Sequence, residues 1–441
     1  MYQNKTVAYY TLGCRLNFAE SSTLAFRLAQ LGFRRIRPND PAEADLLIVN
    51  TCAVTEQATA KCRQQIRKLI RENPKAFVVV TGCYAQIEPK ELADSIGGID
   101  LIVGSEFKGE NLMSYLGDLT KKAEAQVVRT RFQEIQTFHA SCSADDRTRH
   151  FLKVQDGCDY FCTYCTIPMA RGRSRNPHIA DLVAQARDVV NRGGKEIVLT
   201  GVNIGDFGRS TGETFFDLCR ALDDIEGVER YRIGSIEPNL LTDELLHWIA
   251  RDSRRFAPHF HIPLQAGSDE VLRLMRRRYD TALFRQKIEL VKQLLPDAFI
   301  GVDVMAGMRG ETPDLFEKSY RFLQSLPISQ LHPFTYSERN GTKALEIRPV
   351  VPVPERHERT SRLVALSEQK LLAFYQSQAG SVRRVLWEQP EEGKSRMHGF
   401  TENYIRVEHT YVPQWVNTCT EVRLTSRIGD SSQGPVILAD D

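Results

Sequence analysis

Three cysteines stand within eight residues of one another, and thiols at this spacing could hold a metal cluster. Cys158, Cys162 and Cys165 follow the pattern C-x3-C-x2-C. A [4Fe–4S] cube takes four ligands, so three thiolates would leave one iron open to a further ligand. The alternative is a zinc site, which would need a fourth Cys or His nearby. The next histidine, His178, lies beyond two prolines, so the spacing favours the cluster.

A second set of three cysteines, Cys14, Cys52 and Cys83, lies in the N-terminal part of the chain. There β-rich runs alternate with segments of helical spacing, which predicts a parallel sheet with helices on its faces. Each cysteine follows an expected strand, and the carboxyl ends of parallel strands meet at one edge of a sheet. An ordinary buried cysteine is the alternative for any single one, but three equivalent positions predict a second [4Fe–4S] cluster with an open iron. The expected strands cover residues 6–12, 45–50 and 76–81, and the expected helices cover 17–31 and 55–72.

The composition excludes several classes of protein. The chain has 441 residues and a formal net charge of +2, so we expect two to four domains, with any nucleic-acid contact made by local basic patches. Ten cysteines in this length do not form a disulfide scaffold. The start at Met1 lacks the apolar segment of a secretory signal, and no apolar run is long enough to span a bilayer. We expect a cytoplasmic protein without membrane contact, in which Cys62, Cys142, Cys219 and Cys419 are structural.

The middle of the chain, from about residue 147 to residue 369, again alternates strands with helices. Six expected strands predict a partial (β/α) barrel, whose active groups should lie at the carboxyl ends of its strands. Those ends are polar, and glycine turns among them would let the backbone approach a ligand closely. A loop turn followed by a helix cap is the alternative for any single residue, Glu311 among them. The expected strands cover 151–155, 196–201, 231–236, 259–264, 299–305 and 331–335.

Two runs of arginine adjoin the expected active end of this barrel. One follows the three-cysteine turn, and the other follows the helix after the fourth strand. Arginine suits phosphate and carboxylate groups, so we expect contact with RNA or substrate. A solvated helix face is the alternative, which we favour for the basic helix over 61–71. The arginines are Arg171, Arg173, Arg175, Arg276, Arg277 and Arg278.

Short alternating runs replace the helical pattern after about residue 375. They predict a small antiparallel β-barrel with strands over 382–387, 404–407 and 422–424. Basic residues stand beside aromatic ones in these runs, Trp387, Tyr404 and Arg406 among them, and such a surface suits single-stranded or looped RNA. The tail after Arg427 is expected to be turn-rich and poorly ordered.

Five motifs surround the cysteines and the C-terminal runs. They are Thr-Leu-Gly-Cys14-Arg-Leu-Asn, Asn-Thr-Cys52, Thr-Gly-Cys83, Lys153-Val-Gln-Asp-Gly-Cys158 and Gly399-Phe-Thr-Glu-Asn-Tyr-Ile-Arg-Val407. Together they resemble the methylthiotransferase family of radical S-adenosylmethionine (radical-SAM) enzymes over essentially the whole chain. The resemblance implies three α/β or β domains: an open parallel-sheet domain over 1–140 with an auxiliary cluster, a radical-SAM domain with a partial (β/α)6 barrel over 141–375, and a TRAM RNA-binding domain with a small antiparallel β-barrel over 376–441.

The resemblance implies an enzyme with two [4Fe–4S] clusters and S-adenosyl-L-methionine as cofactors. All six motif cysteines would be catalytic, with the auxiliary cluster on Cys14, Cys52 and Cys83 and the radical-SAM cluster on Cys158, Cys162 and Cys165. The contacts with S-adenosylmethionine would come from Tyr164, Gly201, Asn203, Ser235, Glu237 and Gln265. The implied partners are the anticodon stem-loop of tRNA, an electron donor of the flavodoxin or ferredoxin type, and a source of sulfur.

Within the family, the motif at Cys14 and the run Met-Arg-Arg-Arg-Tyr at 275–279 are similar to one branch. That branch methylthiolates N6-threonylcarbamoyladenosine, immediately 3′ of the anticodon, by radical removal of the C2 hydrogen and insertion of sulfur. The substrate carries a carboxylate, so an arginine near the site is physically sensible. Sibling branches act on N6-isopentenyladenosine in tRNA or on an aspartate of a ribosomal protein. The chain departs from the family pattern at Arg15, Ala266 and Asn340, where Lys, Ser and Pro are usual.

Two rival interpretations remain open. One is a radical-SAM enzyme with a different product, such as a methyltransferase, although simple methylation would need no sulfur-bearing second cluster. The other is a non-catalytic iron–sulfur RNA-binding sensor, against which the polar strand ends of the central domain weigh.

Overall fold

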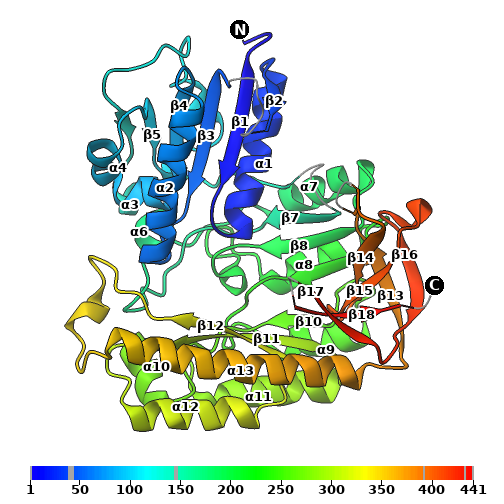
Figure 1. The fold of residues 1–441 in the computed structure, drawn as a ribbon. Helices are drawn as coiled ribbons and strands as arrows, with labels where there is room; N and C mark the ends of the chain where they lie inside the picture. The colour runs from blue at the N-terminus through cyan, green and yellow to red at the C-terminus, as the bar shows by residue number, and fades with distance from the viewer. Residues whose placement is uncertain (1, 38–43, 144–147, 391–392, 432–433, 440–441) are drawn as a thin grey trace.

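Three groups of strands follow one another along the chain, and each falls within one of the expected domains (Figure 1). The computed structural model describes residues 2–37, 44–143, 148–390, 393–431 and 434–439. Met1, where the expected N-terminal domain begins, lies outside the described residues. The same holds for Arg147, where the expected alternation of strands and helices in the central domain begins. The domain boundaries themselves remain a prediction.

The N-terminal group is one sheet of six parallel strands. The strands are β1 (Thr6–Thr11), β2 (Arg34–Ile36), β3 (Leu46–Thr51), β4 (Phe77–Gly82), β5 (Leu101–Val103) and β6 (Gln126–Val128), in the order β2-β1-β3-β4-β5-β6. The connecting helices are α1 (Arg15–Gln30), α2 (Glu56–Glu72), α3 (Cys83–Ile87), α4 (Pro89–Ser95), α5 (Glu110–Met113) and the 3-10 turns η1 (Ser105–Phe107) and η2 (Phe132–Glu134). Strands β3 and β4 are buried over their whole length, as expected for continuous apolar runs covered on both faces. Helix α2 begins after Thr55, whose hydroxyl accepts a hydrogen bond from the N–H of Ala58 and caps the helix.

The central group contains six further parallel strands. They are β7 (Arg149–Lys153), β8 (Glu196–Thr200), β9 (Arg230–Ile233), β10 (His259–His261), β11 (Phe299–Ala306) and β12 (Gln330–Thr335). Two three-stranded sheets, β7-β8-β9 and β10-β11-β12, are joined by a parallel bridge between Ser235 and His261. Six parallel strands in chain order confirm the expected partial barrel. Its helices are α6 (Ile167–Arg171), α7 (Ile179–Asn191), α8 (Phe215–Asp223), α9 (Asp243–Arg251), α10 (Asp269–Met275), α11 (Thr281–Leu294), α12 (Pro313–Ser325), α13 (Val353–Ser377), η3 (Ile204–Asp206) and η4 (Lys343–Glu346).

Side chains of the barrel strands alternate between the helix-covered outside and the interior. On β10, Phe260 is fully buried in the apolar core shared with the helices, so its neighbours His259 and His261 point to the interior. The same alternation on β11 and β12 places Asp303 opposite His332 on the interior side. The barrel interior is therefore partly polar.

The C-terminal group is a six-stranded sheet, antiparallel except where β15 pairs in parallel with β18. Its strands are β13 (Val382–Trp387), β14 (Arg396–Phe400), β15 (Arg406–Thr410), β16 (Cys419–Arg423), β17 (Ile428–Ser431) and β18 (Gly434–Leu438), in the order β16-β13-β14-β15-β18-β17, with the 3-10 turn η5 (Pro413–Trp415). The expectation of a poorly ordered tail after Arg427 is wrong, because β17 and β18 form there and Ile437 lies in the core of this sheet. Trp387 is also part of that core and is not exposed beside basic residues.

The C-terminal sheet packs against the amino ends of the barrel strands. Glu196, at the start of β8, is fully buried and pairs with Arg230 and Arg232 of β9. Arg232 also donates to the carbonyl oxygens of Thr401 and Glu402 at 2.7 Å each. The carboxyl ends of the barrel strands are left to face the N-terminal domain (Figure 1). In the described part of the chain, no helix is both long and apolar enough to cross a membrane.

Candidate functional site

The three N-terminal cysteines lie at the carboxyl ends of neighbouring strands. Cys14 immediately precedes α1, Cys52 follows β3, and Cys83 is the first residue of α3 after β4. Burial, followed by the charges of Cys83 and Cys14, raises the pKa of Cys52 to about 12, so the three thiols lie within electrostatic reach of one another. Cys62 packs its Sγ against the backbone of Cys52 at 3.5 Å.

Two glycines allow these loops to come together. Gly13 has a φ of +109°, and a Cβ there would lie 2.9 Å from the Cβ of Cys52 and 3.2 Å from its Sγ. Gly82 has a φ of +100°, and a Cβ there would lie 2.4 Å from the carbonyl oxygen of Thr51. Asn17 then ties the loops, because its Nδ2 donates to the carbonyl oxygens of Leu12 and Thr51 at 2.8 and 3.0 Å. The backbone around the first cysteine triad is thus closely fitted.

The second cysteine triad occupies the turn between β7 and α6. Burial is the main cause that raises the pKa values of Cys158 and Cys165 to about 12, and the neighbouring thiols add to it. A nitrogen donor approaches each sulfur and would stabilise a thiolate. The donors are the N–H of Tyr160 to Cys158 at 3.5 Å, the N–H of Ile167 to Cys165 at 3.4 Å, and Nη1 of Arg277 to Cys162 at 3.2 Å.

Both triads suit an iron–sulfur cube. Thiolate sulfur is the ligand that such clusters take. Within the described ranges, no three His, Cys, Asp or Glu side chains converge on a point where they could hold a single metal ion. Ligands of different irons in one cube lie further apart than ligands of one ion. The thiol ligands of both triads have the chemistry that such a cluster requires.

Contacts between the domains bring the two triads together. Thr166, next to Cys165, donates from Oγ1 to the carbonyl oxygen of Ala53, next to Cys52, at 3.5 Å. Arg171 on α6 lies within electrostatic reach of the N-terminal thiols. A molecule held at the carboxyl end of the barrel would adjoin both triads.

Unsatisfied polar atoms gather at the carboxyl ends of β8 to β10. Neither side-chain polar atom of the buried Asn203 makes a hydrogen bond of ordinary geometry among the described residues, although the hydroxyl of Tyr160 lies near. Oδ1 of Asn239 and Oγ of Ser268 have no partner there either. Each such atom costs about 1–3 kcal/mol when it stays unsatisfied, so this group indicates a polar ligand. Nδ2 of Asn239 donates to the hydroxyl of Tyr160 at 2.9 Å, which places the group beside the second triad.

Three other residues expected to contact S-adenosylmethionine have fixed backbones at the strand ends. A Cβ on Gly201 would lie 2.8 Å from the Ile204 side chain and 2.9 Å from the carbonyl oxygen of Gln155, so glycine is required. Ser235 and Gln265 each form a bridge with a neighbouring strand. Their contact with the cofactor remains a prediction.

Arg277 belongs to this site and not to an RNA-binding surface. Its side chain is buried, pairs with Glu237 and donates to the Sγ of Cys162. Its Nη1 also lies 3.5 Å from the hydroxyl of Tyr164. Contact of Arg277 with RNA is contradicted, because groups of the site enclose its guanidinium, whereas its contact with substrate remains a prediction. Tyr164 and Glu237, both expected near the cofactor, are brought together by it.

A buried ion network beside the first triad was not foreseen from the sequence. Its members are Glu20, Lys108, Lys153, Asp156, Arg171 and Arg175. Glu20 pairs with Arg171 at 2.9 Å, and Asp156 pairs with Arg171 at 3.0 Å and with Arg175 at 3.2 Å. The expectation that Arg171 and Arg175 contact RNA or substrate is therefore wrong, because protein carboxylates enclose both buried guanidinium groups. Four cations face two carboxylates, so the network leaves positive charge beside thiols that would bind as thiolates.

The other three arginines of the two runs are exposed. Arg173 pairs with Asp159 at 3.3 Å. Arg278 lies 3.9 Å from the ring centroid of Tyr160 and donates to the carbonyl oxygen of Asp159. The side chain of Arg276 has no partner within the described ranges. For these three, contact with RNA remains a prediction.

A polar group inside the barrel is a feature that the sequence reasoning missed. Nε2 of His261 lies 2.6 Å from Oδ1 of Asp303, and the ring of His332 lies 5.1 Å from that of His261. Burial, followed by the charge of His261, lowers the pKa of His332 to about 4, so this ring is neutral at pH 7. Alternating polar residues in the expected strands 259–264, 299–305 and 331–335 carried the signal.

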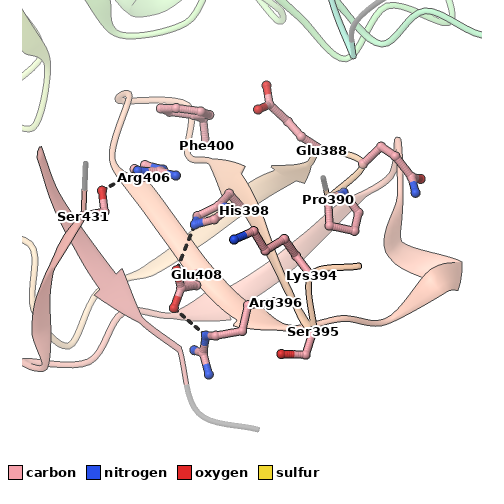
Figure 2. A pocket seen from close by; sticks show the side chains of 11 residues that line it. Glu388, Pro390, Lys394, Ser395, Arg396, His398, Phe400, Arg406, Glu408 and Ser431 are labelled. Atoms are coloured by element: carbon pink, nitrogen blue, oxygen red, sulfur yellow. Dashed lines mark hydrogen bonds and ion pairs between the residues drawn. The ribbon is translucent and has the colours of Figure 1, made fainter. Parts of the chain in front are cut away.

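A pocket of about 460 Å³ opens on the C-terminal sheet (Figure 2). Figure 2 shows the carboxylate of Glu408 between His398 and Arg396, and Arg406 beside Ser431, to which it donates at 2.5 Å. The lining therefore mixes charges of both signs, and RNA contact by Arg406 remains a prediction.

Tyr404 joins the C-terminal sheet to the barrel. Its ring packs against those of Phe400 and His259, with centroids 5.0 and 4.4 Å away, and its hydroxyl accepts a hydrogen bond from Arg149 at 3.1 Å. This packing does not support the expected RNA contact.

Two family models match the chain. The model described as uncharacterized protein family UPF0004 matches residues 6–104, which include the first triad. The model of the radical SAM superfamily matches residues 152–323, which include the second triad.

Curated proteins match the chain over nearly its full length. Threonylcarbamoyladenosine tRNA methylthiotransferase MtaB of Bacillus subtilis (strain 168) is 36% identical, with 95% of this chain and 93% of that protein covered. The protein of the same name from Aquifex aeolicus (strain VF5) is 37% identical, with 91% and 96% covered. The tRNA-2-methylthio-N(6)-dimethylallyladenosine synthase of Protochlamydia amoebophila (strain UWE25) is 30% identical, with 94% and 92% covered.

Solved structures match the fold. The radical S-adenosylmethionine methyltransferase TsrM from Kitasatospora setae, with cobalamin and a [4Fe-4S] cluster bound, gives a TM-score of 0.55 at 15% identity, with 75% of each chain covered. At this identity the likeness concerns the fold alone.

Proposed function

The chain belongs to the methylthiotransferase family of radical-SAM enzymes, and we propose that it converts N6-threonylcarbamoyladenosine in tRNA to the 2-methylthio derivative. Relatives named for that substrate are 31–37% identical, against 30–32% for relatives named for dimethylallyladenosine. The observation that carries the proposal is the adjacency of the two triads, through the contact of Thr166 with Ala53. An adenine at the carboxyl end of the barrel would meet both.

The reaction uses S-adenosylmethionine and two [4Fe–4S] clusters, one on each triad. When bound, these cofactors would supply the radical that activates the C2–H bond, the sulfur that replaces the hydrogen and, from S-adenosylmethionine, the methyl group that this sulfur carries. Asn203 and Asn239 offer buried unsatisfied atoms to the polar groups of S-adenosylmethionine. Arg277 keeps Glu237 and the thiol of Cys162 in place. No general base is proposed, because C2–H is not acidic.

The RNA would be an anticodon stem-loop that reaches the barrel interior. Phe334 on β12 is 46% exposed and lies on the interior side of its strand, where an aromatic ring could stack on a base. The exposed Arg173, Arg276 and Arg278 and the pocket at Arg406 would contact the backbone. An electron donor of the flavodoxin or ferredoxin type and a source of sulfur complete the proposal, which places the protein in the cytoplasm with its tRNA.

Two cysteine substitutions separate the halves of the reaction. Reconstituted enzyme would receive S-adenosylmethionine, dithionite and a stem-loop RNA that contains N6-threonylcarbamoyladenosine. Cys162→Ala is expected to make neither 5′-deoxyadenosine nor methylthiolated RNA, because the radical-SAM cluster loses a ligand. Cys83→Ala is expected to make 5′-deoxyadenosine but no methylthiolated RNA. Liquid chromatography with mass spectrometry measures both products.

Cys419→Ala, in the C-terminal sheet, is the matched control and is expected to make both products. Methylthiolation by Cys83→Ala would contradict a sulfur-supplying role for the first triad. A parallel reaction with RNA that contains N6-isopentenyladenosine tests which branch of the family the chain belongs to. Preference for that RNA would assign the chain to the branch that acts on N6-isopentenyladenosine.

A further inference from the structure

Arg15 has no carboxylate partner among the described residues and lies at the edge that carries the first triad. It is the first residue of α1, directly after Cys14, and its side chain is exposed. Its side-chain contact among the described residues is with the ring of Phe151, whose centroid lies 5.8 Å from Cζ.

The contact with Phe151 directs Arg15 toward the barrel interior. On β7, Leu152 is buried among the helices, so Phe151 next to it faces the interior. The charge of Arg15 also reaches His332 across the barrel, where it adds to the effects of burial and His261 that lower the pKa of that ring. The charge of Arg15 likewise reaches His259 and Tyr404, so its guanidinium lies beside Phe151 on the interior side of the barrel, within electrostatic reach of His259, His332 and Tyr404.

The other charges around this space already have partners. Asp303 is paired with His261, and Glu237 is paired with Arg277. Arg171 is enclosed by Glu20 and Asp156. The guanidinium of Arg15 could therefore bind the carboxylate of a substrate. A neutral alkyl substituent would make no favourable electrostatic contact with Arg15.

We propose that Arg15 binds the carboxylate of the threonylcarbamoyl group and thereby selects the substrate. This inference rests on the proposed function and deepens it. A guanidinium takes a carboxylate through two parallel N–H···O bonds, which fix orientation as well as distance. Because Arg15 adjoins Cys14, this ion pair holds the substituted adenine beside the first triad. A charge-assisted contact of this kind is worth roughly ten- to a hundredfold in affinity.

The test compares two stem-loop RNAs that differ in one group. In one, the threonylcarbamoyl carboxylate is free, and in the other it is a neutral methyl ester. Binding to reconstituted holoenzyme, with S-adenosylmethionine and without reductant, would be followed by fluorescence anisotropy. Wild-type enzyme is expected to prefer the free acid by roughly ten- to a hundredfold. Arg15→Gln is expected to bind both RNAs equally, and Arg15→Lys to keep part of the preference.

Arg276→Gln is the matched control. It removes the same charge from an exposed arginine without a side-chain partner in the described chain, at the carboxyl end of α10. Its preference for the free acid is expected to equal that of wild type, whatever its overall affinity. Since Arg15 adjoins Cys14, the Lys variant separates loss of charge from disturbance of the thiols, and iron content is measured on every variant.

Two results would overturn the inference and leave the proposed function standing. They are an unchanged preference in Arg15→Gln, and a wild-type enzyme that methylthiolates the free-acid RNA yet binds both RNAs equally. Failure of the proposed function would differ: wild-type enzyme with both clusters and reductant would methylthiolate neither RNA, and the inference would fall with it.

Discussion

Gly13 is the residue on which the spacing of the first triad depends most directly. Gly13→Ala would put a Cβ 2.9 Å from that of Cys52, at a φ of +109°. We expect this variant to lose the iron and sulfide of one cluster and to keep the other, because the loop of Cys14 must move away. Iron and sulfide analysis after reconstitution measures this.

Gly117→Ala provides the control. Gly117 also has a positive φ, +56°, but a Cβ there would meet nothing within 4 Å. This variant carries backbone strain without the clash, so full loading is expected. Full loading of Gly13→Ala as well would contradict the account of the first triad.

Residue chemistry was predictable from the sequence where its signal was local. The spacing of Cys158, Cys162 and Cys165 predicts their turn. The other triad is predicted by the position of each cysteine directly after an expected strand. The arginines were not predictable in the same way. Arg171 pairs with Glu20, which lies 151 residues away in the sequence. A run of arginines has the same sequence pattern whether its side chains are solvated or pair with buried carboxylates.

At the scale of elements, long apolar strands were predicted to within a few residues. The expected strands 45–50 and 76–81 correspond to β3 and β4, because a doubly buried strand is a continuous apolar run. Strands β14, β17 and β18 were missed, since they are short and contain glycine or proline that reads as a turn. The barrel itself followed from six strand–helix repeats.

Glu196 at the start of β8 links the barrel to the C-terminal sheet. Burial opposes its ionisation, but Arg232 and Arg230 hold its pKa at about 2. A carboxyl whose pKa is lower in the folded state stabilises the fold above its unfolded pKa, near 4.5, and the stabilisation is lost as pH falls through about 2. The difference corresponds to about 3 kcal/mol at pH 7.

Glu196→Gln is expected to lower the free energy of unfolding by about 3 kcal/mol at pH 7. The gap from wild type should narrow as pH falls from 4.5 toward 2, because the wild-type carboxylate then loses its contribution. Urea unfolding measures this change through the fluorescence of Trp387 on β13 and of Trp415 in η5, which packs against the core of the C-terminal sheet. Glu388→Gln, which removes a partly exposed pair with Arg149, should cost less than about 1 kcal/mol. Equal costs for the two variants would contradict the linking role of Glu196.

At the scale of the whole molecule, the barrel is enclosed from two sides. The N-terminal sheet brings its thiols to the carboxyl ends of the barrel strands, and the C-terminal sheet covers their amino ends (Figure 1). The sequence predicted the kinds of sheet correctly: an open parallel sheet, a partial barrel and a largely antiparallel C-terminal sheet. Their mutual placement depends on contacts between distant residues, such as Thr166 with Ala53 and Arg232 with Thr401, which no periodicity records.

The most direct test of the central claim is mass spectrometry of tRNA nucleosides. The host would lack its own methylthiotransferases and would carry this gene, its Cys83→Ala variant or neither. The account predicts that 2-methylthio-N6-threonylcarbamoyladenosine appears with the wild-type gene alone. Unchanged tRNA in cells whose wild-type protein carries both clusters, or 2-methylthio-N6-isopentenyladenosine in its place, would contradict the account.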